Sequence, residues 1–464
     1  MPRSMTRSML SSLALLCLAG TSLAAPPAAT PARPPAFGTA EHPFAADSPW
    51  NARPVSPVFG TAEIPTSSYF PAIGGGAFST ISFLGGKESP SQQVVGAKGK
   101  PDVWDYNQGV QRAITITHWP AGLTPASGSD GHADIAEPET GMLHSFWQLR
   151  QRGDHWSAVG YAWSRLKGRG WGDPADFYQG TRAVGIPSTA GLIRRHEIDD
   201  GLPVYRHALA MSLTFNGLSK SPAYIFPATA ADIDASRNTG NIPEGALMML
   251  PPDYDTGKIA NARLRKVAET LKTYGAYVVD RNEGTPFYIY VENGSDFSLH
   301  GKGWNQDVAR ELQRIRAGLR QVVSAGGWLD GNGKPMKMEK PTNLLSLRGP
   351  WRGNGGDYDA IDDRLKLEAG GKARSSVLRD IGRVSWAAPR DGAQCRFSVQ
   401  ATGGATLALQ VRSADMTQQL FDSGPLADGA SATLPCPSGK ARYDLIAAGG
   451  KTDATVRATL AVQD

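Results

Sequence analysis

Short segments in which apolar and polar residues alternate recur through most of this chain of 464 residues, each bounded by Gly, Pro, Asp or Ser. Successive side chains of a strand point to opposite faces, so the alternation predicts strands, and the bounding residues favour turns. Several stand close together near the C-terminus: CRFSVQA, ATLALQVRS, SATLPC, ARYDLIAA and ATVRATLAV. We expect a small accessory β-sandwich over residues 358–464.

The same pattern dominates residues 40–330, where we expect the main domain. HADIA, MLHSFWQL and WSAVGYAW predict a three-stranded meander, and VYRHALAMSLTF and FYIYVEN predict further strands. Two segments have helical periodicity instead: KIANARLRKVAETLKTYG, which ends at a glycine, and NQDVARELQRIRAGLRQVV. The predicted fold class is mainly β with a few inserted helices. Residues 331–357, rich in Gly, Pro and Lys without a sustained period, predict a linker between the two domains.

The N-terminus has the pattern of a signal peptide. Arg3 and Arg7 precede an uncharged apolar run, and Ser22-Leu23-Ala24 forms a small-x-small cleavage site. We expect residues 1–24 to be removed by cleavage near Ala24, and the Pro/Ala-rich residues 25–39 to form an extended tether. No later run is long enough to cross a membrane, so we expect a protein without a membrane span, secreted or periplasmic.

The net charge and the number of cysteines limit which classes of binding partner and which cysteine chemistry we expect. The chain carries a formal net charge of +5 without concentrated Lys/Arg clusters, which argues against nucleic acid and is compatible with an acidic polysaccharide. Cys395 and Cys436 are the cysteines that remain after cleavage, and in an oxidising compartment we expect them to form a disulfide inside the sandwich. A thiol nucleophile is therefore not expected.

The stretch GLIRRHEIDDGLPVYRHALAMSL (191–213) concentrates ionisable residues between apolar ones. Its first part predicts a short helix in which His196 and Glu197 begin a zinc-protease-like H-E-x-x motif, but Asp200 replaces the second histidine. Its second part predicts a strand from Val204 on which His207 shares the large apolar face with Tyr205. A buried imidazole needs partners for both nitrogens, so His207 is either a satisfied core residue or a pocket residue beside Tyr205.

A second cluster lies in SGSDGHADIAEP, where Asp130, His132 and Asp134 alternate at a strand entry and should share one face. Such a set could pair a general acid with a base, or could weakly hold a divalent cation, although an ordinary polar turn has the same composition. We otherwise expect no cofactor.

Tryptophans occur in turn-rich loops such as DSPWNARP, KPDVWDYN and GRGWGDP. An indole in a loop either plugs the end of a sheet or offers a face on which a sugar ring can stack. We take Trp50, Asn51 and Trp147 as candidate substrate-binding residues.

The order DSPWN (47–51), SDGHADIAEPETGMLHSFWQL (129–149), GIPSTAGLIRRHEIDDGLPVYRHALAM (185–211), AYIFPA (223–228) and IPEGALMML (242–250) resembles a group of exported bacterial proteins of unassigned activity. The group shares a D-S-x-W-N start, a D-x-H strand and a G-L-I-R-x-x-E segment leading to an H-A-L strand. The resemblance covers roughly residues 43–290. It identifies Trp50, Asn51, Asp130, His132, Glu197 and His207 as pattern positions without giving them roles, and His196 departs from the acidic residue expected there.

Together these features favour a secreted carbohydrate-active enzyme that cleaves glycosidic bonds of an extracellular polysaccharide by hydrolysis. Asp130 and Glu197 would be its carboxylate pair, tuned by His132 and His207. One alternative is a polysaccharide lyase acting on a uronate, with His207 or Tyr205 as the base. Another is a non-catalytic glycan-binding or envelope protein. Catalysis requires the Asp130 and Glu197 clusters to converge in one cleft.

Overall fold

The computed structural model describes residues 36–301, 303–361 and 363–463, and residues 36 onward form one compact unit. The expected signal peptide and residues 25–35 of the expected tether lie outside the described residues. The described chain consists mainly of β-strands with two α-helices, which confirms the predicted fold class. None of the described helices has both the length and the apolar character needed to cross a membrane.

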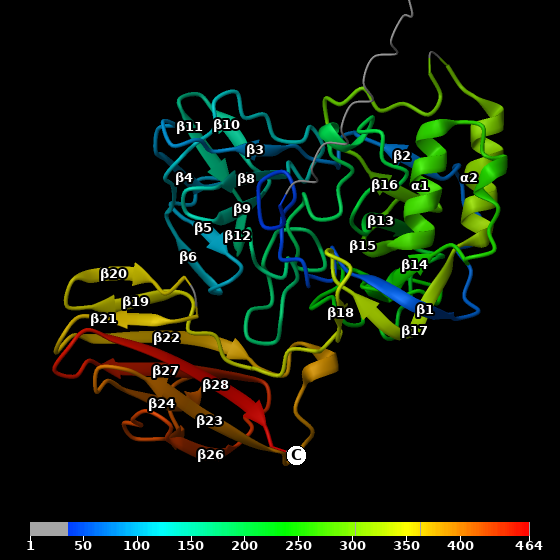
Figure 1. Cartoon of the computed structure of the whole chain (residues 1–464). Coiled ribbons are helices and arrows are strands. Elements are labelled where there is room, and N and C mark those ends of the chain that lie inside the picture. The colour runs from blue at the N-terminus through cyan, green and yellow to red at the C-terminus, as the bar shows by residue number, and fades with distance from the viewer. Residues whose placement is uncertain (1–35, 302, 362, 464) are drawn as a thin grey trace, which may run out of the picture. The chain divides into compact units, whose positions relative to one another are not determined.

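A mixed sheet carries the helices (Figure 1). Its strands, in spatial order, are β1 (Arg53–Phe59), β17 (Arg320–Leu329), β14 (Leu247–Met249), β15 (Ala276–Asn282), β13 (Leu209–Thr214), β16 (Phe287–Tyr290) and β2 (Ala72–Gly74), and β18 (Pro335–Met336) pairs with β17.

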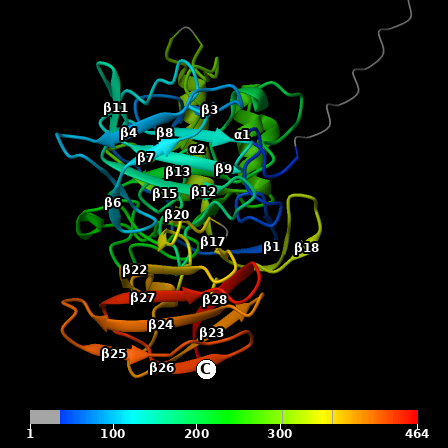
Figure 2. The same ribbon diagram turned by 90° about the vertical axis from the view of Figure 1, so that its left-hand side faces the viewer.

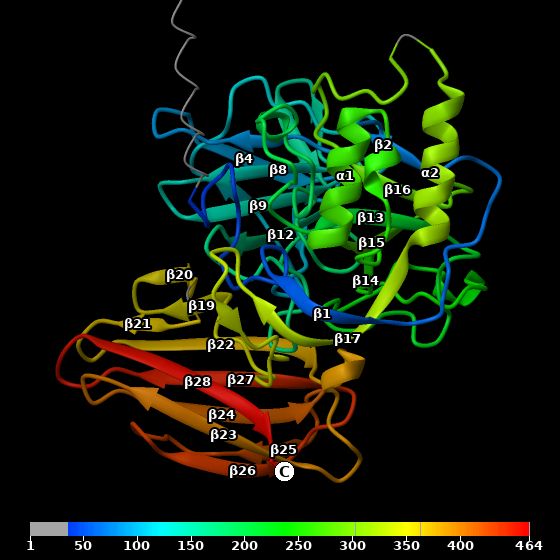
Figure 3. The same cartoon turned by 45° about the vertical axis from the view of Figure 1, so that its right-hand side comes forward.

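Helices α1 (Ala262–Thr273) and α2 (Gln306–Gly318) lie against one face of this sheet (Figure 3). Each begins after an asparagine whose side chain accepts backbone N–H groups of the first turn, Asn261 for α1 and Asn305 for α2. Their apolar faces pack with alternate residues of β13, including Leu209 and Met211, into one buried cluster. The sequence predicts both helices, but the second was expected to continue to Val323, whereas it ends at Gly318 and the chain from Arg320 forms β17.

The opposite face of this sheet packs on a second sheet through a cluster that includes Trp50, Trp171 and Tyr277. The second sheet contains, in spatial order, β3 (Ser82–Leu84), β8 (Ala133–Glu137), β9 (Met142–Trp147), β12 (Gly160–Arg165), β5 (Val103–Asp105) and β6 (Val110–Arg112). The predicted meander is present as β8, β9 and β12. Its third predicted strand, WSAVGYAW, is divided, because residues up to Ala158 form β11 in another sheet and only those from Gly160 lie in β12.

A four-stranded sheet comprises β10 (Arg150–Arg152), β11 (His155–Ala158), β4 (Gln92–Gly96) and β7 (Ile114–Ile116). Trp119 and Trp156 plug the core beside it.

The C-terminal part is the expected β-sandwich (Figure 2). One sheet has the order β20 (Gly356–Asp359), β19 (Pro350–Gly353), β22 (Lys372–Asp380), β27 (Lys440–Ala448), β24 (Thr406–Ser413), β25 (Gln419–Asp422). The other has the order β21 (Leu365–Leu367), β28 (Ala454–Val462), β23 (Gln394–Ala401), β26 (Ser431–Pro435). Cys395 and Cys436 form the expected disulfide.

The segment 331–357, for which we expect a linker, is built into the fold. β18 extends the helix-bearing sheet, and β19 belongs to the sandwich. Leu344, Leu347 and Trp351 are buried in the sandwich core. The sandwich therefore recruits residues before position 358, because these apolar side chains lie within a stretch whose overall composition is polar.

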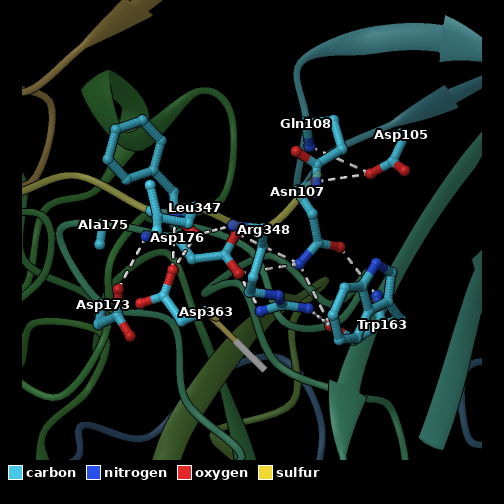
Figure 4. Close-up of polar contacts among 12 residues, drawn as sticks. Asp105, Asn107, Gln108, Trp163, Asp173, Ala175, Asp176, Leu347, Arg348 and Asp363 are labelled. Atoms are coloured by element: carbon cyan, nitrogen blue, oxygen red, sulfur yellow. Dashed lines mark hydrogen bonds and ion pairs between the residues drawn. The ribbon is translucent and has the colours of Figure 1, made fainter. Parts of the chain in front are cut away.

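Buried polar contacts join the sandwich to the loops of the main domain (Figure 4). The Arg348 guanidinium pairs with Asp176 and lies 3.3 Å from the centroid of the Trp163 ring. Arg379 donates to the backbone carbonyls of Ala175 and Asn107. Because these groups are buried, they hold the two parts together through contacts that tolerate little change.

Asp176→Asn should lower the free energy of unfolding, because it leaves the buried Arg348 guanidinium without its carboxylate partner. Burial raises the pKa of Asp176, so the loss should be smaller than the roughly 3–5 kcal/mol of a fully ionised buried pair. The double variant Arg348→Met/Asp176→Leu should lose clearly less. Arg352→Met, which breaks an exposed pair with Asp357, is the control and should change stability by less than about 1 kcal/mol. Urea unfolding measures all three, and equal losses for Asp176→Asn and Arg352→Met would contradict the assignment.

Candidate functional site

Glu197 and His207 meet in the structure. Glu197 ends a single 3₁₀ turn (Arg195–Glu197) and accepts the backbone N–H of Arg194, whereas His207 lies just before β13. His207 Nε2 lies 3.2 Å from Glu197 Oε2, and its Nδ1 lies 2.8 Å from the carbonyl oxygen of Ala208. Both partners are acceptors, so both ring nitrogens carry protons and His207 is an imidazolium.

The two pKa values move in the directions that stabilise this pair. Burial alone would raise the pKa of Glu197, but the charge and hydrogen bond of His207 lower it to about 2. Burial alone would lower the pKa of His207, but Glu197 outweighs it and raises that pKa above its usual value. Glu197 therefore holds no proton to give at neutral pH, and the protonated form of His207 that this pair favours has no lone pair with which to abstract one. The role of general acid in hydrolysis therefore does not fit Glu197, and the role of base in β-elimination does not fit His207.

His42 completes what we call the histidine cavity, a space of about 20 Å³ that His42, Asn51, Thr189, Glu197 and His207 help to line. The Asn51 amide N–H₂ faces three backbone carbonyls, so its Oδ1 accepts from His42 Nε2 at 3.1 Å. Burial and the charge of His207 lower the pKa of His42 to about 4. A neutral imidazole thus lies beside a charged one in a space that fits a single water molecule.

Trp50, Asn51 and Tyr205 are structural residues. Trp50 is 1% exposed and stacks on Trp171 at 4.9 Å between ring centroids, so it offers no face to a sugar. Asn51 binds the 43–45 backbone. Tyr205 is buried in the cluster under α1, with Lys266 Nζ 4.6 Å from its ring centroid, and burial raises its pKa above the ordinary value. The strand expected from Val204 begins at Leu209, because residues up to 207 form bends after Gly201 and Pro203.

Asp130 contacts other residues than those that His132 and Asp134 contact. Asp134 accepts from the Ser145 hydroxyl at 2.7 Å and from both the backbone N–H and the hydroxyl of Thr189. Thr181 links Ser145 to His132. These residues form a hydrogen-bond network that connects β8, β9 and the 181–189 loop. Burial lowers the pKa of His132 to about 3. Among the described residues, no group of three His, Cys, Asp or Glu is placed to hold a metal ion.

Asp130 instead belongs to a carboxylate group that sequence patterns did not reveal, made of Asp130, Asp232, Glu244 and Asp280. Trp147 Nε1 donates to Asp130 at 3.3 Å, and Glu244 accepts the backbone N–H of Asp232 at 2.7 Å. Burial and the charge of Asp280 raise the pKa of Asp232 to about 6, and Asp130 adds to this shift. These residues are dispersed between positions 130 and 280, so no local motif joins them.

Two arginine side chains form ion pairs with the carboxylate group. Arg182 is 1% exposed and donates to Asp280 at 2.7 Å, with its Nε and Nη2 atoms buried and unpaired. Arg281 lies 3.8 Å from Asp232. Glu197 makes its contacts in the histidine cavity, so the expected Asp130 and Glu197 pair is not assembled in one set of contacts.

A large open feature of the described residues is what we call the aromatic groove. It consists of two adjoining hollows of about 310 Å³ and 500 Å³ that share Trp104 and Tyr106. Trp104 is 39% exposed, and the Tyr106 and Tyr178 rings lie 5.2 Å apart. Further lining residues are Lys98, Lys100, Asp102, Gln111, Gln108, Phe177, Arg379, Asp380, Arg383 and Lys440.

Local sequence explains how the aromatic groove is built. Trp104 lies in β5, whose neighbour β12 starts with Gly160, and a Cβ at Gly160 would lie 2.2 Å from the Tyr106 ring. The missing side chain therefore lets Tyr106 pack on the strand. Trp104 lies in the tryptophan-containing loop KPDVWDYN. Other residues that line the groove come from positions 177–178 and from the sandwich.

No protein-family model and no curated protein matches this sequence. Among solved structures, TmCBM61 in complex with β-1,4-galactotriose aligns at 12% identity and a TM-score of 0.17, covering 26% of this chain and 100% of that chain. A structure described as "CBM4 structure and function" aligns at 14% identity and a TM-score of 0.16, covering 25% of this chain and 80% of that chain. TM-scores this low identify neither the fold nor a ligand of this chain.

Glu197→Gln should reduce the free energy of unfolding by about 1–3 kcal/mol, most strongly between pH 4.5 and 6.5. The lowered pKa of Glu197 gives stability that is present above pH 4.5 and lost as the pH falls towards 2. The raised pKa of His207 gives stability that is full below pH 6.5 and lost as the pH rises through the folded-state value.

Denaturant unfolding between pH 3 and 9 measures this difference, with exposed Glu139→Gln as the control. A difference that is independent of pH would show that His207 and Glu197 are not an ion pair.

Proposed function

We propose that this is an exported protein that binds a polysaccharide along the aromatic groove. The observation that carries the proposal is the exposed Trp104 ring at the junction of two hollows large enough for sugar residues. A pyranose ring presents an apolar C–H face that stacks on indole, and its hydroxyl groups need polar partners at the edges. Gln111 and Asp102 supply an amide and a carboxylate group beside that ring.

The groove uses both parts of the chain. Tyr106, Phe177 and Tyr178 belong to the main domain, whereas Arg383 and Lys440 come from the sandwich. The Arg383 guanidinium donates to the Tyr178 hydroxyl at 2.7 Å, so this wall is fixed across the junction. The sandwich therefore takes part in the proposed site rather than acting as a separate module.

Trp104→Ala should weaken polysaccharide binding at least about tenfold, because one stacked sugar loses its platform. Trp304→Ala is the matched control, since Trp304 is 61% exposed and lies outside the groove. Affinity electrophoresis in gels containing a panel of neutral and acidic polysaccharides measures the effect. Equal retardation of wild type and Trp104→Ala in every gel that retards the wild type would refute the groove as the binding site.

Cleavage of a glycan at the carboxylate group, which lies outside the lining of the aromatic groove, is a second candidate function, and the raised pKa of Asp232 favours it. Hydrolysis needs one carboxylic acid to protonate the departing glycosidic oxygen and a carboxylate to take a proton from the attacking water. Asp232, with its pKa raised to about 6, suits the acid. Asp130, hydrogen-bonded to the half-buried Trp147, suits the base, and the water adds to the sugar as the C–O bond breaks.

Asp232→Asn should abolish the release of reducing ends while leaving the free energy of unfolding equal or higher at pH 8, since it removes a carboxylate whose ionisation burial opposes. Asp234→Asn, an exposed neighbour, is the control. A reducing-sugar assay on the polysaccharides that bind measures the activity. Cleavage by wild type that persists in Asp232→Asn would exclude this acid, and binding without any cleavage by wild type would leave only the first function.

A further inference from the structure

The aromatic groove carries an excess of free positive charge. Lys98 and Lys100 line one hollow, and Arg383 and Lys440 line the other. All four are exposed, and none of them lies within 4 Å of a carboxylate oxygen among the described residues. Unpaired cations on both sides of an aromatic ring are the arrangement that a negatively charged chain would neutralise.

The groove's own carboxylates offset only part of this charge. Asp380 stands opposite Lys440 in the β22–β27 register without a contact within 4 Å, and its Oδ1 accepts the backbone N–H of Gly382. Asp102 is the other lining carboxylate, beside Lys98 and Lys100. The four unpaired cations therefore outnumber the two carboxylates.

Arg383 is the best placed of these cations. Its guanidinium lies 5.0 Å from the Tyr178 ring centroid and 5.2 Å from that of Phe177, and one of its nitrogens donates to the Tyr178 hydroxyl. The hydrogen bond and the two ring contacts hold the guanidinium beside Tyr178, and its remaining N–H groups make no hydrogen bond among the described residues. A planar donor held in this way matches a carboxylate or sulfate better than a mobile ammonium group does.

The lining also separates a charged glycan from a nucleic acid. Asp102 and Asp380 can accept hydrogen bonds from sugar hydroxyls, which a DNA backbone lacks. The exposed Gln111 adds an amide group suited to hydroxyls.

We infer that the ligand of the aromatic groove is an anionic polysaccharide, with uronate carboxylates or sulfate groups bound by Arg383 and Lys440 on one side of Trp104 and by Lys98 and Lys100 on the other. The inference rests on the proposed function, because it assigns the charge of the ligand at that same site. Stacking on Trp104 supplies affinity for the ring, and the cations select the charged chain.

The test compares ligands that differ in charge alone: polygalacturonate, alginate and hyaluronan against their esterified forms, and dextran sulfate against dextran. Isothermal titration of the full mature chain with each polymer gives the affinities at two salt concentrations. The variants are Lys98→Gln/Lys100→Gln and Arg383→Gln/Lys440→Gln. The matched control is Lys334→Gln/Lys451→Gln, which removes two exposed lysines outside the groove.

We expect at least one acidic polymer to bind tightly and its neutral counterpart to bind at least about tenfold more weakly. Each groove double variant should lose about tenfold or more towards the acidic polymer, lose its salt dependence in part, and keep its affinity for the neutral form. The control should bind as wild type does. Circular dichroism of each variant confirms that folding is retained.

Three outcomes would overturn the inference. Equal affinity for the acidic and neutral forms, with loss of binding in Trp104→Ala, would leave the proposed function standing and remove only the charge selection. Binding that survives Trp104→Ala would refute the groove itself. A single-stranded oligonucleotide that binds as tightly as the acidic polymer, with the same dependence on Lys98 and Arg383, would assign the groove to nucleic acid.

Discussion

The buried ion pair between Arg348 and Asp176 is the interaction on which the rest of the arrangement depends. It joins the chain entering the sandwich to the 173–178 loop, and Trp163 covers its charged group. The same loop presents Phe177 and Tyr178 to the aromatic groove, while the sandwich supplies Arg383 and Lys440. A groove wall built from two parts of a chain needs a fixed junction, and a desolvated pair provides one at the cost of tolerating no single substitution.

The ionisable residues of the main domain divide into structural and available groups. Glu197, His207 and Asp134 are buried, and their side chains form hydrogen bonds with other groups of the protein. Asp232 is partly exposed, and its pKa is raised to about 6. Perturbed pKa values alone do not mark catalysis; what distinguishes these groups is whether a proton can leave or arrive at the working pH.

The strands of the sandwich, the strands β8 and β9, the two helices and the disulfide could be predicted from the sequence because each rests on local periodicity or on elimination. The strands β15 and β17 were not predicted. The linker over 331–357 could not, since the burial of Leu344 and Trp351 depends on strands that follow much later. Glu197 and His207 are only 10 positions apart in the chain, so their contact could have been inferred from the sequence. The carboxylate group and the aromatic groove join residues far apart in the chain, so only the folded structure brings Asp130 near Asp280 and Trp104 near Arg383.

The most direct test of the central claim is the ¹⁹F spectrum of the protein labelled with 5-fluorotryptophan, recorded during titration with an acidic polysaccharide and assigned with Trp104→Phe and Trp304→Phe. The account predicts that the Trp104 resonance shifts and broadens, while those of Trp304 and the buried Trp50 stay in place. A titration in which the Trp304 resonance moves and that of Trp104 does not would contradict it.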